Sequence, residues 1–141
     1  MNYSQFLAGK RTLIQPAGFD VPESAINPML FPWQRQIVKW AIKQGRAALF
    51  EECGLGKTFQ QVDWARIVAE HTGSRVLILA PLAVAHQTVS EAARLGVAIR
   101  YARSQDQVNG MPERIIITHY DLLSASDAEE WGGVGLHESR I

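Results

Sequence analysis

The chain has 141 residues, of which 47% are hydrophobic and 20% charged; these values indicate one globular domain and exclude an intrinsically disordered protein. Fourteen Lys and Arg side chains balance fourteen Asp and Glu side chains, so no overall field steers the protein to nucleic acid. Cys53 is the single cysteine, which excludes a disulfide framework and favours a reducing, cytosolic setting. The sequence shows neither a secretion signal nor an apolar run long enough to cross a bilayer.

Residues 1–30 are predicted to form an irregular N-terminal arm. Pro16, Gly18, Pro22 and Pro28 punctuate this stretch, so it can hold at most short helices. From residue 31 onward the pattern is that of a single α/β domain.

A helix and a short strand are predicted to open this domain. The stretch "WQRQIVKWAIKQG" places Ile37, Trp40 and Ala41 at helical spacing and ends in Gly45, a natural helix stop. The apolar run "RAALF", residues 46–50, then has the length of a strand.

Strands and helices alternate through the remainder of the chain. Phe59, Val62, Ala65 and Val68 fall on one face of a helix that should end near Gly73. The further predictions are a strand buried on both faces at 75–81, a helix at 83–96, strands at 97–102 and 114–120, and a weak strand within 131–141. This alternation predicts an α/β fold with a parallel sheet and right-handed crossovers.

The stretch "ALFEECGLGKTFQ" predicts a phosphate-binding loop. Gly54, Leu55 and Gly56 lie between the predicted strand and the next helix, where backbone N–H groups can surround an anion at a helix N-terminus. Lys57 can bind the outer phosphates, and the Thr58 hydroxyl can bind Mg²⁺. A glycine-bearing turn before an ordinary helix is the alternative interpretation.

Glu51 replaces a glycine of the general loop pattern and points to one branch of these proteins. The stretch "ECGLGKT" resembles the ATP-binding motif of superfamily 2 helicases, most closely the Snf2-like, phage-type members, in which an acidic pair precedes Gly-Leu-Gly-Lys-Thr. The resemblance implies the P-loop NTPase fold of a RecA-like lobe, with ATP and Mg²⁺ as cofactors and a catalytic role for Lys57. "FPWQRQIVKWAI" is similar to the family's adenine-recognition motif, which implies that Gln34 reads the base with its amide donor and acceptor. Plain polar surface is the alternative for Gln34.

Two downstream segments resemble the nucleic-acid contacts of this family. "LILAPLAVAHQT" is similar to motif Ia, which implies that Pro81, His86 and Gln87 touch nucleic-acid backbone. "IITHYDLL" resembles motif Ib, in which Thr118 could bond phosphate, whereas Tyr120 is expected to pack under the strand. An ordinary strand-to-helix junction with a buried or solvated histidine is the alternative for the first segment.

The sequence departs from the family at the strand that should end in Asp-Glu. "GGVGLHES" puts His137 in the position of the Mg²⁺-holding aspartate and Glu138 in that of the glutamate that positions the attacking water. An imidazole is a poor ligand for Mg²⁺, a hard ion that prefers oxygen. We therefore expect ATP binding with little or no hydrolysis, unless the alignment of this polar tail is accidental.

The resemblance as a whole implies that residues 31–141 are the ATP-binding N-terminal part of a Snf2-like DNA helicase or translocase, an incomplete RecA-like lobe that ends at this last motif. The expected partners are nucleic acid, DNA more than RNA and weakly bound, and a second helicase lobe supplied in trans, without a membrane partner. The expected location is the cytosol of a bacterium or of a phage-infected host. A small P-loop phosphotransferase and a nucleotide-binding module without catalysis are the competing functions.

Overall fold

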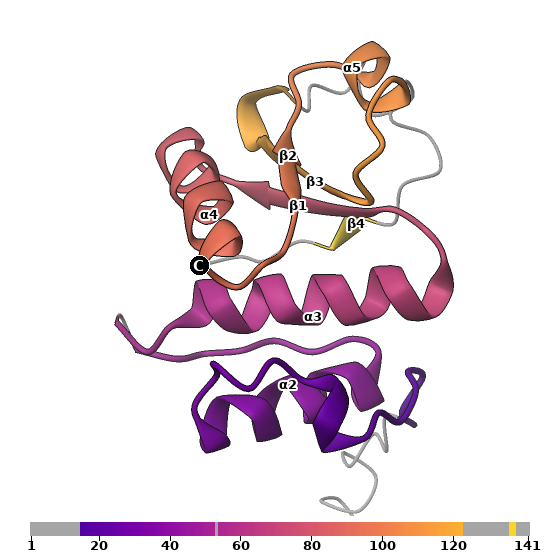
Figure 1. Cartoon of the computed structure of the whole chain (residues 1–141), viewed down its shortest axis with the longest axis vertical. Coiled ribbons are helices and arrows are strands. Elements are labelled where there is room, and N and C mark those ends of the chain that lie inside the picture. The colour runs from indigo at the N-terminus through magenta and orange to yellow at the C-terminus, as the bar shows by residue number, and fades with distance from the viewer. Residues whose placement is uncertain (1–14, 53, 123–135, 138–141) are drawn as a thin grey trace, which may run out of the picture.

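The computed structural model describes residues 15–52, 54–122 and 136–137. Figure 1 shows the helices gathered around a four-stranded sheet in the order β2-β3-β1-β4, in which every pairing is parallel. The elements are the 3₁₀ helix η1 (Glu23–Ala25), α2 (Pro32–Gln44), α3 (Lys57–Thr72), β1 (Val76–Ala80), α4 (Leu82–Arg94), β2 (Ile99–Tyr101), α5 (Gln105–Asn109), β3 (Ile115–His119), η2 (Tyr120–Leu122) and β4 (Leu136–His137). The predicted α/β class and parallel sheet are confirmed.

Strand β1 is apolar along its whole length because both faces of the sheet are covered. Val76 and Ile78 pack in the core cluster that also takes in residues of α3 and α4. The residues between and after them, Leu77 and Leu79, pack in a second cluster with Val108 of α5. This alternation is the period of two expected for a strand, and it confirms the prediction of a strand buried on both faces.

The two long helices that flank the phosphate-loop sequence end where the sequence predicted. Helix α2 stops before Gly45 and α3 stops before Gly73, and both glycines have positive φ. The buried face of α2 differs from the predicted one. Val38, Ala41 and Ile42 are buried, whereas Trp40, which was predicted to lie on that face, is exposed.

The predicted strand at 46–50 is wrong. These residues form no part of the sheet, and the Phe50 side chain is 95% exposed. Both sides of β1 are already paired, on one side with β3 and on the other with β4. A segment of this length has no independent stability as a strand without a partner for its backbone groups, and residues 46–52 instead run as irregular chain from α2 towards the start of α3 (Figure 1).

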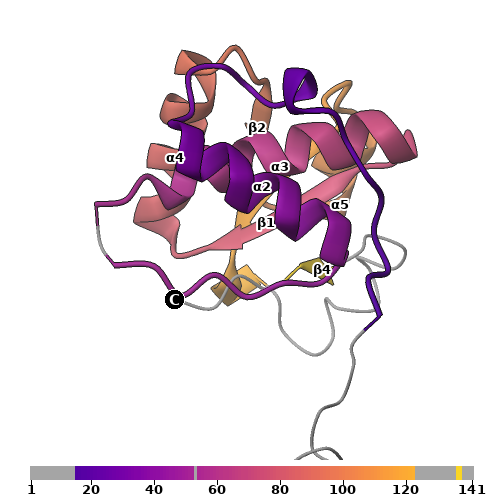
Figure 2. The ribbon, with the colours of Figure 1, turned by 90° about the horizontal axis from the view of Figure 1, so that it is seen from below.

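The layers can be followed in Figures 1 and 2: the sheet lies on one side of α3, and α2 lies on the other. The described part of the N-terminal arm, residues 15–30, is irregular except for η1. It is nevertheless part of the core, because Val21, Ile26 and Leu30 are buried there. None of the helices in the described part of the chain has the length and apolar character that a membrane crossing requires.

Candidate functional site

The predicted phosphate loop leads into the N-terminus of α3, at the edge of the molecule where β1 also ends. Helix α3 leads through a short connection into the beginning of β1, and the two run in opposite directions (Figure 1). The start of α3 therefore lies at the carboxyl edge of the parallel sheet, the edge at which open α/β sheets bind ligands. The first N–H groups of a helix have no partner within the helix and attract anions.

Gly56 shapes the turn that leads into α3. It precedes the first helical residue, with φ of 72° and ψ of 34°, a left-handed conformation that other residues rarely adopt. A β-carbon at this position would also come within 2.5 Å of the Gln34 Nε2 atom. The backbone conformation therefore favours glycine, and any other residue would also displace the end of the Gln34 side chain.

The structure places Gln34 directly against the loop. Its Nε2 atom donates a hydrogen bond to the Leu55 carbonyl at 2.9 Å, and its Oε1 atom accepts one from the backbone N–H of Phe31, also at 2.9 Å. The side chain is 3% exposed. Gln34 thus joins the start of α2 to the loop across 21 residues of sequence, and it is not polar surface.

Lys57 folds back over the loop. Its Nζ atom donates to the Glu51 carbonyl at 2.7 Å, so the ammonium group lies within the loop and not in open solvent. The Glu51 carboxylate accepts a hydrogen bond from Gln60 Nε2 through its Oε2 atom at 2.9 Å. Residues at the beginning of the loop are therefore tied to the first turn of α3.

The remaining predicted nucleotide-binding residues lie next to these. Leu55 and Gly54 are exposed on the turn before α3, and a β-carbon on Gly54 would meet nothing within 4 Å. Thr58 is the second residue of α3 and is half-buried. Five of the six predicted nucleotide-binding residues are contiguous in sequence. Gln34 is the member of that set whose position beside the others depends on the fold.

The four residues predicted to touch nucleic acid divide into two groups. Pro81 caps the start of α4, and His86 and Gln87 are exposed on that helix. Thr118 is 0% exposed, and its hydroxyl donates to the Ala102 carbonyl at 2.8 Å. That hydroxyl joins β3 to the chain after β2. Because it is buried and already bonded, we do not propose Thr118 as a nucleic-acid contact. Tyr120, which was expected to pack under the strand, is at the surface.

Residues beyond the predicted set also gather at this edge. The Tyr101 hydroxyl and the His119 Nδ1 atom are 2.6 Å apart, and the ring of His86 lies 4.8 Å from that of Tyr101. The buried amide of Gln60 and, further along α3 and away from this edge, the buried carboxylate of Asp63 were missed as well. Helix α3 lies between the sheet and α2 and is buried on both sides (Figure 1), so the single apolar face predicted from the sequence did not include the last two.

The final motif is described in part. His137 lies on β4, where it is paired in register with Ile78 of β1, so the weak strand predicted within 131–141 is confirmed over residues 136–137. Glu138 lies outside the described residues. Across the described ranges, no group of three or more His, Cys, Asp or Glu side chains is arranged to hold a metal ion.

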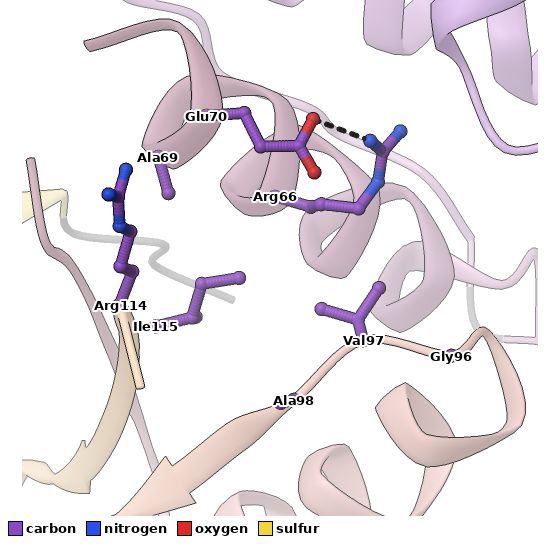
Figure 3. A pocket seen from close by; sticks show the side chains of 8 residues that line it. All are labelled: Arg66, Ala69, Glu70, Gly96, Val97, Ala98, Arg114 and Ile115. Atoms are coloured by element: carbon purple, nitrogen blue, oxygen red, sulfur yellow. Dashed lines mark hydrogen bonds and ion pairs between the residues drawn. The ribbon is translucent and has the colours of Figure 1, made fainter. Parts of the chain in front are cut away.

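A surface hollow of about 220 Å³ lies elsewhere (Figure 3). Its walls come from the C-terminal half of α3, from residues 96–98 and from the start of β3. This is the amino edge of the sheet, away from the loop. Arg66 faces the hollow but is already bonded to Glu70 at 2.9 Å and to Asp63 at 2.7 Å, so the hollow is distinct from the predicted phosphate site.

The comparisons with known proteins add no assignment. No protein-family model matches the chain, and no curated protein matches it.

Proposed function

We propose that this chain is an ATP-binding, RecA-like lobe of a Snf2-like superfamily 2 DNA helicase or translocase. The proposal joins the family resemblance of the loop, the glutamine motif and motif Ia to the local geometry. The observation that carries it is the position of Lys57, held within a glycine turn at the N-terminus of α3. An exposed turn of this kind presents an ammonium group and free backbone N–H groups to one anion.

The residues around the loop fit a nucleoside triphosphate. Lys57 would exchange the Glu51 carbonyl for a phosphate oxygen, with which its charge makes a stronger hydrogen bond. Gly56 leaves room beside the loop for the Gln34 side chain, which a β-carbon would displace. Thr58 would be placed to bind a Mg²⁺ ion held on the phosphates. The irregular chain that replaces the predicted strand before the loop is the main departure from the expected fold.

Gln34 would have a double role in such a site. An amide offers two N–H groups and two acceptor lone pairs, and the contacts to Phe31 and Leu55 use one of each. The remaining donor and acceptor suit the edge of an adenine. Because the side chain is so well buried, base recognition through Gln34 requires the loop to shift when the nucleotide enters.

Turnover by this chain alone is expected to be low. The family places an aspartate at position 137, where the oxygen of a carboxylate would favour Mg²⁺ more than an imidazole does. A second helicase lobe, supplied in trans, would add the arginines that stabilise the transferring phosphoryl group. DNA is the proposed nucleic acid along which the protein moves, and Pro81, His86 and Gln87 are its proposed contacts.

The substitution Lys57→Ala tests the proposal. ATP affinity should fall about ten- to a hundredfold, because a charge-assisted hydrogen bond to phosphate contributes about 1.5–3 kcal/mol. Isothermal titration calorimetry on the folded variant measures the dissociation constant for ATP.

Lys43→Ala is the matched control, because it removes the same charge from the far end of α2. Position 43 lies about 13 Å along the helix axis from Gln34, and its ammonium pairs with Asp20 at 3.2 Å. Equal dissociation constants for the parent and Lys57→Ala proteins would refute the phosphate-loop assignment. So would an equal loss in both variants.

A further inference from the structure

The amide of Gln60 lies behind the loop and contacts it at two places. Its Nε2 atom donates to the Glu51 carboxylate at 2.9 Å and approaches the Leu55 carbonyl at 3.5 Å. These contacts lie at the beginning of the loop and just before Gly56. The side chain is 1% exposed, so it is built into the fold and is not a surface group in chance contact.

The direction of this amide is determined by its neighbours. Both groups that face Nε2 are acceptors, so a flipped amide would set its own oxygen against a carboxylate and a carbonyl. The Gln60 Oε1 atom and the Glu51 Oε1 atom are both buried without a hydrogen-bond partner among the described residues. Within that part of the chain, Gln60 is thus the side chain that anchors the Glu51 carboxylate.

That anchor matters because of the neighbouring lysine. The main-chain carbonyl of Glu51 already accepts a hydrogen bond from Lys57 at 2.7 Å, so the carboxylate of the same residue belongs to the same small region. A carboxylate binds an ammonium group more strongly than a neutral carbonyl does. A released Glu51 carboxylate would compete with an incoming phosphate for Lys57 and would repel that phosphate.

We propose that Gln60 is a positioning residue that keeps the Glu51 carboxylate away from Lys57, so that the lysine stays available to phosphate. The role deepens the proposed ATP site and rests on it. Gln60 would act through Glu51 and would not touch the nucleotide itself. The neutral carbonyl then serves as an exchangeable partner for Lys57 while the charged oxygens remain tied to α3.

The test removes the amide and then removes the charge that it restrains. Gln60→Met keeps a similar side-chain volume without a donor, and we expect its affinity for ATP to fall about tenfold. The affinity for AMP should change less, because Lys57 acts on the outer phosphates. Adding Glu51→Gln to Gln60→Met should recover most of the ATP affinity, since no free carboxylate is left. Gln36→Met, an exposed change on α2, is the control.

A purely structural role for Gln60 predicts a different pattern. Loss of packing would weaken ATP and AMP alike, and Glu51→Gln would not restore binding. That result overturns the proposal while leaving the ATP site itself intact. If Gln60→Met does not fold, as judged by circular dichroism, the same comparison is made with Gln60→Ala.

A measurement without nucleotide separates this proposal from the ATP assignment. The rate at which an N-hydroxysuccinimide ester acylates Lys57, followed by mass spectrometry, should fall in Gln60→Met and recover in the double variant. A lysine nitrogen that is engaged by a carboxylate is less available to attack the ester and reacts more slowly. An unchanged rate in Gln60→Met overturns the positioning role. If the parent chain binds no ATP but the rates follow the expected order, the proposed function fails and the restraint of Glu51 stands.

Discussion

At the scale of single residues, the contact between Gly56 and Gln34 is the most constrained in the site. The left-handed backbone at Gly56 disfavours any other residue, and a β-carbon there would displace the Gln34 Nε2 atom. Gly54, two residues earlier, also has positive φ, at 84°, but a β-carbon there would meet nothing within 4 Å. Comparing substitutions at these two glycines therefore separates the cost of backbone strain from the cost of steric contact with Gln34.

Gly56→Ala should destabilise the protein more than Gly54→Ala. Alanine in a left-handed conformation costs about 1–2 kcal/mol at either position. At position 56 the displaced Gln34 also loses two hydrogen bonds of about 1 kcal/mol each, for a total of about 3–4 kcal/mol. Urea unfolding of both variants measures the difference. Equal costs would show that Gln34 yields to the added methyl group without losing its partners.

The sequence predicted the contiguous part of this site but not its supports. Gly54 to Thr58 follow one another, so their proximity depends on the chain alone. Gln34 was identified through a motif. Its bond to Phe31 is local to the start of α2, but its bond to the loop depends on how α2 packs against α3. The restraint of Glu51 by Gln60 likewise depends on side-chain directions that spacing does not determine.

At the scale of elements, a buried cluster joins the N-terminal arm to α3 and α4. Asp63 of α3 is 0% exposed and accepts from the backbone N–H of Asn27 at 2.9 Å and from Arg66. The Asn27 side chain donates to the Leu95 carbonyl just beyond α4. Burial acts to lower the pKa of Arg66, but its hydrogen bonds and charge interactions with Asp63 and Glu70 outweigh burial and raise the pKa.

Asp63→Ala should therefore destabilise the fold by about 3 kcal/mol, the size expected when one partner of a buried ion pair is removed. Glu70→Ala is the matched control, because Glu70 pairs with the same arginine from an exposed position and exposed pairs contribute less than about 1 kcal/mol. Chemical unfolding at neutral pH compares the two. Similar losses would mean that the arm is not held through Asp63.

The elements were predicted well where local signals decide them. Gly45 and Gly73 ended their helices as expected, and the apolar runs at β1 and β3 became buried strands. The run at 46–50 has the same local character, yet it lies outside the sheet. Whether this run joins the sheet depends on which distant segments pair with β1. A five-residue pattern carries no information about that pairing. The burial of Asp63 depends equally on Asn27, 36 residues away.

At the scale of the whole molecule, the balance of fourteen basic and fourteen acidic side chains bears on the proposed DNA contact. Without an overall positive field, the dissociation constant for nonspecific DNA should be no tighter than about 10⁻⁶ M at physiological salt, and affinity should fall steeply as salt rises. His86→Glu should weaken binding about two- to fivefold through local repulsion of phosphate.

Asn109→Asp is the control for the DNA measurement. It adds the same charge on α5, which covers the other face of the sheet from α4. Fluorescence anisotropy over a salt series compares the three proteins. An equal or larger effect of Asn109→Asp would place the nucleic-acid surface away from α4.

The order of the layers determines which part of the molecule is expected to unfold first. Helix α2 packs mainly on α3, and residues 17–19 of the arm donate backbone hydrogen bonds to its last carbonyls. Partial unfolding follows such boundaries, since units with few buried neighbours open before the centre of a sheet does. Detachment of this outer layer would withdraw Gln34 from the Leu55 carbonyl while leaving every strand pairing intact. If the proposed ATP site is correct, moderate heating would accordingly remove nucleotide affinity while the sheet is still native, and loss of binding would precede global denaturation.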